Sequence, residues 1–533
     1  MVRSLQSYVT RQAERRPQAI ALVDGDHSVT YEALETRANR LARLLREGAA
    51  PGDRIGLLLP KSPAAVAAML ATLKAGAIYV PLDPESPAAR LEKILRVAGC
   101  RYLLASAPAV PLLRQLIPRL DPAPRPDLVW MGDVPADTGD LAATFCEADA
   151  SALSPEPLPD GGAGDDAAHL LFTSGSTGAP KGVIVAHRNV IAFVTWANAY
   201  FGVAESDRVS CHSPFAFDLS TWDLFGGFAA GAEVHLVPPQ LNLFPGRLVE
   251  FIRERRLTQW FSVPSLLAYL ARFDAVQPGD FPELRRIIWC GEVFATPALR
   301  YWMEQVPHAS FTNLYGPTET TIASSYHTVE APPSDPGATV PIGRACDGET
   351  LHILDPDLRP LPPCEVGEIG IGGAGVTLGY WRDPERTRAA FVTLPSEPAC
   401  RVYRTGDLGM RDREGLVHFL GRRDSQIKSR GHRIELGEIE AALLSMPEIG
   451  EGAVVAFQAE GFGGHTICCA YVAEAGVALS PAVARQRLAA LVPRYMLPAR
   501  WRAMDQLPSN ANGKVDRVAL REMFSQERGE PAS

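Results

Sequence analysis

The segment 171–183, LFTSGSTGAPKGV, combines the residue types that bind phosphate groups. Residues 173–179 are all small and include two glycines, so the backbone can approach a phosphate closely. Hydroxyls and backbone N–H groups supply hydrogen-bond donors, and Lys181 supplies positive charge. The segment therefore predicts a phosphate-binding loop, to which these residues contribute: Thr173, Ser174, Gly175, Ser176, Thr177 and Lys181.

This loop differs from the phosphate loop of P-loop NTPases, which requires the pattern GxxxxGK[ST]. Here Lys181 follows Pro180 and precedes Gly182, so a P-loop NTPase is disfavoured. A flexible Gly/Ser linker is the structural alternative. Linkers seldom contain an ordered Pro-Lys-Gly, however, and they seldom adjoin an apolar run such as residues 169–172. We therefore favour a loop that binds a nucleotide.

The elements that would position this loop alternate between helices and strands. Apolar residues at helical spacing over 30–47 are followed by an apolar run at 55–59, an alanine-rich helical stretch at 64–75 and a second run at 77–80. This rhythm is typical of a layered α/β domain. The sequence therefore predicts the α/β fold class.

The character of the sequence changes after about residue 345, where short strand-like runs alternate with glycines. A highly charged segment, GRRDSQIKSRGHRIE at 421–435, then precedes a small α+β pattern. We expect a large N-terminal α/β domain with several subdomains over 1–423 and a small C-terminal α+β domain over 424–533. A chain of 533 residues is too long for one compact core, which agrees with this division.

Composition excludes several functional classes. A net charge of −9 disfavours a general nucleic-acid binder, because neutralising phosphates requires a basic surface. The nine cysteines form no CxxC pair, so neither a zinc motif nor a redox motif is predicted. The sequence contains neither a signal peptide nor eighteen consecutive apolar residues. We therefore expect a cytoplasmic protein with reduced thiols.

The stretch TSGSTGAPKG at 173–182 resembles the signature of the adenylate-forming superfamily, which includes amino-acid adenylation domains, acyl-CoA synthetases and luciferases. Further motifs follow in the family's order: FDLS at 217–220, NLYGPTETT at 313–321, YRTGDLG at 403–409, the segment 421–435, and NGKVDR at 512–517. The resemblance covers essentially the whole chain and is strongest to adenylation domains of nonribosomal peptide synthetases. It implies ATP-dependent activation of a carboxylic acid as acyl-AMP, release of pyrophosphate and transfer of the acyl group to a thiol.

The resemblance also assigns catalytic roles. Charge that builds on the α-phosphate must be met by donors and cations already in place. Thr318 would contact the α-phosphate, and Glu319 would bind Mg²⁺, a hard cation that prefers oxygen ligands. Lys514 would be the main catalytic cation, reaching from the small domain to the substrate carboxylate and the α-phosphate.

For the nucleotide, the resemblance places Tyr315 against adenine, Asp407 on the ribose hydroxyls and Arg422 near the ribose and phosphates. The other nucleotide-binding residues that it implies are Gly291, Glu292, Asn313 and Gly316. Asp424 falls at the family's hinge. The small domain would rotate there after adenylation and present the loop around 430–432 to a pantetheine arm.

Asp218 is the residue that indicates the class of acid. Members that activate amino acids have an aspartate here, which pairs with the substrate ammonium. The structural alternative is a helix N-cap. The motif alignment predicts a substrate pocket lined by Asp218, Leu219, Trp222, Ser262, Ile288, Cys290, Leu314, Ile322 and Ala323. The bulk of these side chains favours a small amino acid: alanine first, then glycine, serine or 2-aminobutyrate.

No carrier motif follows Lys514, so the resemblance implies a discrete ligase that loads the phosphopantetheine thiol of a separate carrier protein. The carrier could be a peptidyl or an acyl carrier protein of a peptide or hybrid polyketide pathway. Two alternatives stay open. One is an acyl- or aryl-CoA ligase, which Asp218 opposes. The other is a catalytically silent ATP-binding regulator, which the presence of Lys514 and Glu319 opposes.

Overall fold

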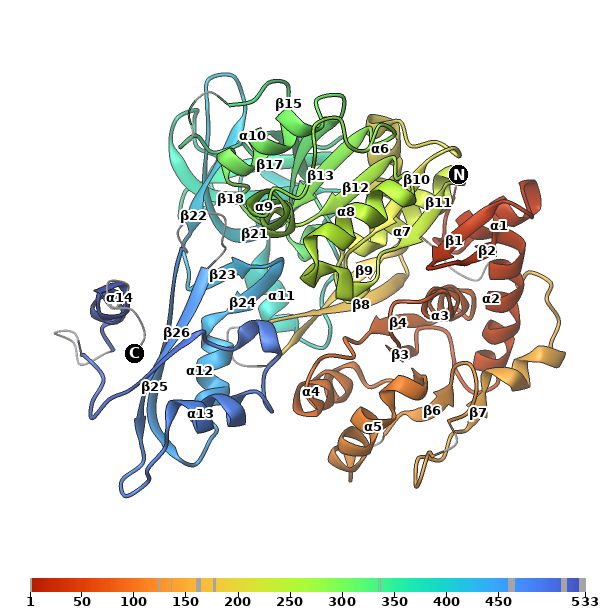
Figure 1. Ribbon diagram of the computed structural model, residues 1–533, viewed down its shortest axis with the longest axis horizontal. Helices are drawn as coiled ribbons and strands as arrows, with labels where there is room; N and C mark the ends of the chain where they lie inside the picture. The colour runs from red at the N-terminus through yellow and green to blue at the C-terminus, as the bar shows by residue number, and fades with distance from the viewer. Residues whose placement is uncertain are drawn as a thin grey trace.

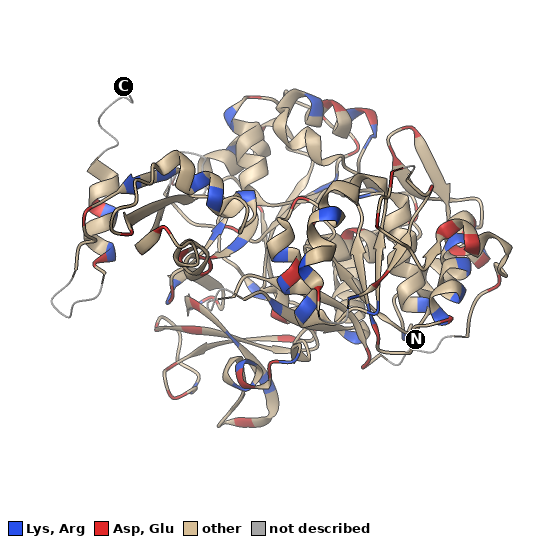
Figure 2. Cartoon of the chain, turned by 90° about the horizontal axis from the view of Figure 1, so that it is seen from below, with Lys and Arg blue, Asp and Glu red and all other residues tan. Residues whose placement is uncertain are grey.

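The computed structural model shows a large and a small domain side by side (Figure 1). The residues that the structure describes are 2–122, 125–135, 137–159, 164–175, 179–333, 335, 337–458, 465–509 and 515–526. Within them no helix is both long enough and apolar enough to cross a bilayer. Acidic and basic residues are interspersed over the elements of both domains (Figure 2), which agrees with the modest net charge.

The first sheet of the large domain has nine strands in the order β16-β15-β14-β13-β12-β10-β11-β1-β2. Its strands are β1 (Ile20–Asp24), β2 (His27–Thr30), β10 (Arg208–Cys211), β11 (Glu233–Leu236), β12 (Gln259–Ser262), β13 (Arg286–Cys290), β14 (Ser310–Tyr315), β15 (Ser325–Val329) and β16 (Arg344–Ala345). Strands β12, β13 and β14 are parallel and adjacent. Their carboxyl ends therefore meet at one edge, where ligands bind in open α/β sheets.

The second sheet has eight strands in the order β19-β9-β8-β4-β3-β5-β6-β7. Its strands are β3 (Arg54–Leu58), β4 (Ile78–Pro81), β5 (Tyr102–Ala105), β6 (Asp127–Trp130), β7 (Phe145–Cys146), β8 (Ala167–Thr173), β9 (Lys181–Ala186) and β19 (Gly379–Tyr380). Strands β8 and β9 are antiparallel and pair Thr173 with Lys181. The predicted phosphate loop is therefore the connection of a hairpin.

Helices cover these sheets and confirm the α/β prediction. They are α1 (Ser7–Arg15), α2 (Tyr31–Arg46), α3 (Pro63–Lys74), α4 (Ala88–Ala98), α5 (Val110–Leu116), α6 (His187–Phe201), α7 (Leu219–Ala230), α8 (Pro245–Glu254), α9 (Pro264–Arg272) and α10 (Thr296–Gln305). Helix α2 begins after Thr30, whose side chain accepts a hydrogen bond from the Ala33 N–H. Helix α3 is apolar on every side and buried from Ala65 to Lys74.

A third sheet follows in the chain, with β17 (Glu349–Leu354), β18 (Val366–Gly373), β21 (Glu397–Arg411) and β20 (Phe391–Leu394) in that order, and β22 (Val417–Arg422) beside β21. Helix α11 (Pro384–Ala390) leads into β20. Several of the glycines that the sequence places here lie in β18. At Gly370 and Gly372 a Cβ atom would collide with side chains of the neighbouring strands.

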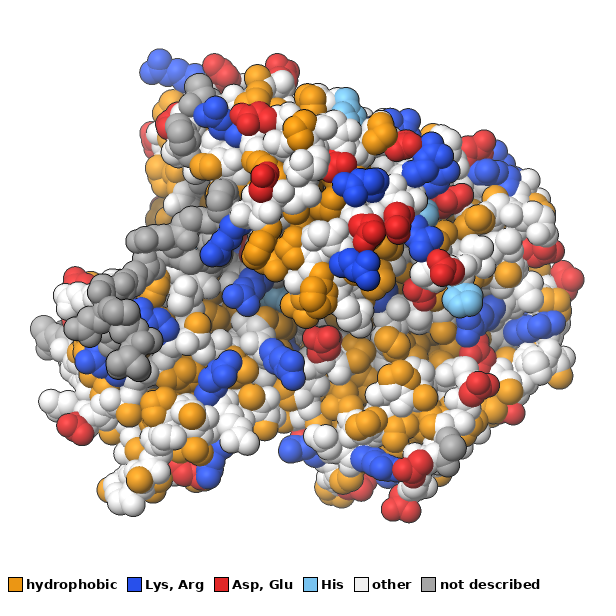
Figure 3. Space-filling view, in the orientation of Figure 1, with side chains coloured by type: hydrophobic (Ala, Val, Ile, Leu, Met, Phe, Trp, Pro, Cys, Tyr) orange, Lys and Arg blue, Asp and Glu red, His pale blue; other side chains and the backbone are white. Residues whose placement is uncertain are grey.

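The small domain has its own apolar cores, built from residues between 427 and 524. Its elements are β23 (Gln426–Ser429), β24 (His432–Glu435), α12 (Leu436–Leu444), β25 (Ile449–Gln458), β26 (His465–Ala473), α13 (Pro481–Leu488), β27 (Arg500–Ala503) and α14 (Arg517–Gln526). On the face seen in Figure 3, Lys and Arg side chains lie along the seam between the two domains. The small α+β domain is thus confirmed.

Candidate active site

The cleft at the carboxyl edge of β12–β14 brings together two distant motifs. The turn Gly316-Pro317 follows β14 and leads into the short helix Thr318–Thr320, and Asp218 directly precedes α7. The Thr318 hydroxyl donates a 2.7 Å hydrogen bond to Oδ2 of Asp218. Two residues that lie 100 positions apart in the sequence therefore form one polar contact inside the cleft.

Asp218 occupies the N-cap position of α7, yet its side chain makes no capping hydrogen bond. The structure therefore does not support the N-cap interpretation. Part of the side chain is accessible from the cleft, but burial raises the pKa of this carboxyl to about 6, which the Thr318 hydroxyl only partly offsets. Within the described ranges no Lys, Arg or His forms an ion pair with it.

Glu319 is fully buried and fully engaged. Its Oε1 accepts hydrogen bonds of 2.8 Å from Lys181 Nζ and 2.8 Å from the Tyr380 hydroxyl. Its Oε2 accepts one of 2.8 Å from Arg433, which belongs to the small domain. Burial alone would raise the pKa of Glu319, but the Arg433 and Lys181 charges outweigh it and hold that pKa well below its usual range.

Glu319 offers a Mg²⁺ ion the oxygen ligand that a hard cation prefers. Lys181 and Tyr380 engage Oε1, and both belong to the large domain. Among the described residues, only Arg433 donates to Oε2, so a cation could bind this oxygen if Arg433 did not occupy it. The residues present therefore fit the ion in the arrangement from which Arg433 has withdrawn.

A cavity of about 430 Å³ lies where the nucleotide is expected. Its lining includes the predicted residues Gly291, Glu292, Asn313, Leu314, Tyr315 and Arg422. Gly291 has a φ of +99°, and a Cβ atom there would meet no atom within 4 Å. A Cβ at Gly316, in contrast, would lie 2.6 Å from the Ala323 backbone. The open floor at Gly291 is suited to a flat base.

Asp407 lines a smaller neighbouring cavity and is held by two predicted partners. The Tyr315 hydroxyl donates a 2.6 Å hydrogen bond to its Oδ2, and Arg422 donates to its Oδ1. Arg422 also donates to both oxygens of Asp424, at 2.7 and 2.8 Å. One guanidinium thus joins the predicted ribose carboxylate to the predicted hinge residue.

The phosphate loop is described in part. Ser174 donates a 2.6 Å hydrogen bond to the Arg433 carbonyl, and a Cβ on Gly175 would collide with the Ala179 backbone. The Thr173 hydroxyl is buried without a hydrogen-bond partner and lies on the wall of a smaller cavity. An unpartnered donor of this kind suits a phosphate oxygen. Ser176, Thr177 and the predicted catalytic Lys514 lie outside the described residues.

The smaller cavity has a volume of about 130 Å³ and joins the predicted substrate and phosphate residues. Among the nine predicted pocket residues, Asp218, Leu219 and Cys290 line it. Trp222, Ile288, Leu314, Ile322 and Ala323 pack with Leu219 and Cys290 in one apolar core around it. The Trp222 indole donates to Asn198 at 3.1 Å. The Ser262 hydroxyl is buried and accepts a 2.9 Å hydrogen bond from Trp260.

The loop around 430–433 reaches into this cleft from the small domain. The Gly431 N–H donates a 2.9 Å hydrogen bond to Glu292 Oε1. The His432 ring stacks on Tyr495 at 3.6 Å between centroids and meets Phe217 edge-on at 4.9 Å. Burial lowers the pKa of His432 to about 3, so its imidazole is neutral. A buried ion pair between Arg90 and Glu438 holds the two domains together nearby.

Sequence reasoning missed three residues that contact the site. Arg433 is part of the motif at 421–435 and could have been singled out by its charge. Lys428 lies in the same motif, with its Nζ 5.5 Å from the centre of the Tyr315 ring. Tyr380 had no signal, because its contact with Glu319 depends on the pairing of β19 with β9.

Two family matches cover most of the chain. Residues 9–381 match the family described as AMP-binding enzyme, and residues 438–514 match the AMP-binding enzyme C-terminal domain. The sequence is 36% identical over 520 residues to tyrocidine synthase 3 of Brevibacillus parabrevis, and 33% identical over 522 residues to tyrocidine synthase 1 of the same organism. These alignments cover 97% and 98% of this chain, but only 8% and 45% of those proteins.

Solved structures show the same architecture. The Vibrio cholerae adenylation domain AlmE, in complex with glycyl-adenosine-5'-phosphate, superposes with a TM-score of 0.84 at 26% identity, covering 99% of this chain and 98% of that one. The holo form of PA1221, a nonribosomal peptide synthetase protein with adenylation and PCP domains, gives 0.79 at 28% identity, covering 98% and 84%. The chain therefore belongs to the AMP-binding enzyme family, as an AMP-forming ligase similar to the adenylation domains of nonribosomal peptide synthetases.

Proposed function

We propose that this ligase activates a small, neutral amino acid as aminoacyl-AMP and transfers the aminoacyl group to the phosphopantetheine thiol of a carrier protein. The observation that carries the proposal is Asp218, a carboxylate enclosed in the cleft that has a hydroxyl partner but, among the described residues, no ion-pair partner. An amino acid would supply the missing ammonium group. Fatty and aryl acids would leave this carboxylate uncompensated, which is costly in an enclosed site.

In the first half-reaction, an oxygen of the amino-acid carboxylate attacks the α-phosphorus of ATP, and the bond to pyrophosphate breaks. Thr318 stands beside Asp218, so one hydroxyl can bridge the ammonium subsite and the α-phosphate subsite. A Mg²⁺ ion held by Glu319 would neutralise phosphate charge. Lys514 would supply the second cation, and Tyr315, Asp407 and Arg422 would hold the nucleoside.

A small side chain is supported by the narrow cavity. Its volume is about 130 Å³, and Leu219 and Cys290 are the side-chain-pocket residues that reach it. AlmE, which holds glycyl-adenosine-5'-phosphate, offers a similar fold. We propose alanine and glycine as the foremost substrates, followed by serine and 2-aminobutyrate. One methylene changes discrimination by only ~1–3 kcal/mol, so neighbouring substrates will be accepted at reduced rates.

The position of the segment 430–433 in the cleft supports our proposal for the second half-reaction, the formation of the thioester. In it the carrier thiol loses its proton, its sulfur attacks the acyl carbonyl, and AMP leaves. Gly431 and His432 already line the cleft beside Asp218 and Thr318. PA1221 contains adenylation and PCP domains in one protein, which supports a carrier as the acceptor here. We propose Asp424 as the hinge, with domains 1–423 and 424–533.

The decisive experiment is amino-acid-dependent ATP–pyrophosphate exchange with a panel of acids. Exchange should be highest with alanine or glycine, lower with larger side chains, and absent with fatty and aryl acids. The aminoacyl-AMP should then load a phosphopantetheinylated carrier protein supplied separately. Exchange with fatty or aryl acids but with no amino acid would support a CoA ligase and reject the proposal. No exchange with any acid would support a silent nucleotide binder.

A further inference from the structure

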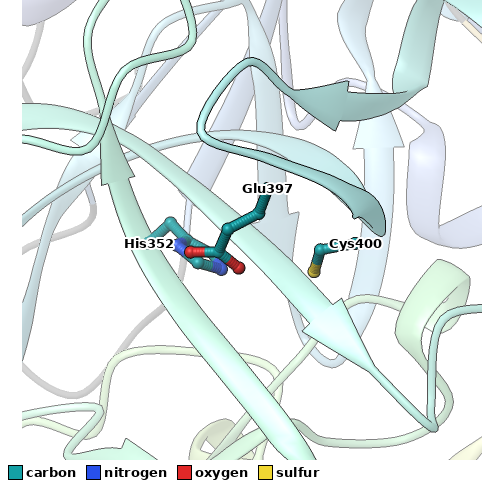
Figure 4. Close-up of side chains that lie close together, drawn as sticks. All are labelled: His352, Glu397 and Cys400. Carbon is teal, nitrogen blue, oxygen red and sulfur yellow. The ribbon is translucent and has the colours of Figure 1, made fainter.

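The third sheet carries a cluster of metal-ligating side chains far along β21 from the residues of the cleft. His352 comes from β17, and Glu397 and Cys400 come from the first part of β21. One ligand atom of each lies within 4.8 Å of the others. Figure 4 shows the Glu397 carboxylate beside the His352 ring, with the Cys400 side chain to the other side of the carboxylate in this view. Three donors of different chemistry therefore converge from two strands.

Strand β18, which lies between β17 and β21, leaves room for the three side chains to approach one another. Strand β18 separates β17 from β21 and has glycine at 372. A Cβ atom on Gly372 would lie 2.9 Å from Cys400 Sγ and 2.6 Å from Thr350 Oγ1. The Thr350 hydroxyl lies 3.1 Å from His352 Nε2, and such outer partners orient a metal-binding imidazole. The glycine thus lets side chains from both flanking strands share one space.

Two of the three donors lack competing partners. Within the described part of the chain, neither the Glu397 carboxylate nor the Cys400 thiol forms a hydrogen bond or ion pair. All three side chains keep some exposure to solvent, which gives an ion a route of entry.

We propose that His352, Glu397 and Cys400 form a zinc site, with water as the fourth ligand. A soft thiolate, an imidazole and a carboxylate together suit Zn²⁺ and not Mg²⁺. On binding, the S–H bond of Cys400 breaks, its proton goes to solvent, and a sulfur–zinc bond forms. Zinc bonds of about 2.0–2.3 Å require the donor atoms to close in by roughly an ångström.

The site would fasten the β20–β21 hairpin to β17. The apolar cluster next to it is the smallest among the described residues, with Leu354, Leu394 and Val402 as its buried members. A small apolar core contributes little stability, so a bound metal ion would add substantially to the stability of this part of the sheet. The inference does not depend on the proposed enzymatic activity, because none of the three donors belongs to the proposed active site.

The test uses the full chain, stripped with a chelator and then titrated with Zn²⁺ in the absence of ATP and Mg²⁺. About one zinc ion should bind per chain, and zinc should raise the midpoint of thermal unfolding. Cys400→Ser and His352→Gln should each weaken zinc binding at least tenfold. Cys364→Ser removes an exposed thiol outside the cluster, and it should bind zinc as the unchanged protein does.

Cobalt gives a direct readout of the sulfur ligand. The Co²⁺-loaded protein should show a thiolate-to-cobalt charge-transfer band that Cys400→Ser abolishes and Cys364→Ser retains. ATP–pyrophosphate exchange by Cys400→Ser reports that the variant is folded. A missing band, a band that persists in Cys400→Ser, or equal zinc binding by all variants would overturn the proposal.

Discussion

Asp218 and Glu319 are carboxylates of the same cleft, and the protein treats them in opposite ways. Glu319 is paired with Lys181 and Arg433, and those charges lower its pKa despite complete burial. Asp218 has the Thr318 hydroxyl but no ion-pair partner among the described residues, and burial raises its pKa to about 6. The difference teaches that the charge of Glu319 is balanced within the protein, whereas the described residues leave the carboxylate of Asp218 unpaired.

The largest effect that tests this difference between the two carboxylates is expected for Asp218→Asn. The change removes the partner of the substrate ammonium, and losing one member of an enclosed pair costs about 3–5 kcal/mol. We expect kcat/KM for the amino acid to fall about 10²–10⁴-fold in ATP–pyrophosphate exchange. Propionate, which lacks the ammonium of alanine, is the matched control.

The unchanged protein should prefer alanine to propionate strongly, and Asp218→Asn should lose most of that preference. If the variant still prefers alanine by the original factor, the carboxylate does not bind the ammonium group.

Glu319→Gln should instead affect the folded state. It leaves Lys181 and Arg433 without their carboxylate in a buried site, which costs about 3 kcal/mol. Unfolding by urea, followed without any ligand, should shift to lower concentration. Asp218→Asn should shift unfolding the other way, because it removes an uncompensated carboxylate. Equal destabilisation by Glu319→Gln and Asp218→Asn would contradict the view that Glu319 is paired and Asp218 is not.

The pH dependence sharpens the comparison further. The pKa of Asp218 is about 6 in the folded chain and 3.8 as the reference value, so the folded state binds this proton more tightly. Its contribution to stability is therefore full below pH 4 and is lost as the pH rises towards 6.

Binding of the amino acid should instead strengthen as the pH rises, because only the ionised carboxylate of Asp218 pairs with the substrate ammonium. Below pH 6, kcat/KM should fall about tenfold per pH unit at saturating ATP. Asp218→Asn should show a flat profile over this range. Glu319 stays ionised throughout, since its neighbouring cations hold its pKa well below the range.

The smallest expected effect concerns Arg433, which occupies the Glu319 oxygen that a cation would need. Arg433→Gln removes this competitor. We expect the Mg²⁺ concentration for half-maximal exchange to fall about three- to tenfold, or roughly 1 kcal/mol. Arg430→Gln, which changes an exposed arginine in the same loop, serves as the control. An unchanged Mg²⁺ requirement in Arg433→Gln would show that Arg433 and Mg²⁺ do not compete for Glu319.

Much of the fold could be predicted, because it depends on local signals. The helical spacing over 30–47 became α2 with Thr30 as its cap, and the run at 55–59 became β3. Motif order also identified residues that do lie together, such as Tyr315, Asp407 and Arg422. These successes rest on periodicity and on motifs of fixed sequence.

Long-range pairing could not be predicted. The loop motif predicts Lys181 at a phosphate, and the structure pairs its ammonium with Glu319, which lies 138 positions away in the sequence. Trp222 was expected to line the substrate pocket, yet its indole is held by Asn198 and it packs edge-on against Phe261. A sequence places Trp222 on the correct helix, but which side of the core its ring occupies depends on neighbours from other elements.

The two ion pairs of Arg422 have a consequence for rotation of the small domain. One rigid guanidinium holds Asp407 in the large domain and Asp424 at the proposed hinge. Any rotation about Asp424 must first release charge-assisted hydrogen bonds, which are among the strongest in proteins. These contacts would therefore resist small rotations, and a nucleotide whose ribose bound Asp407 would compete with Arg422 and weaken that resistance.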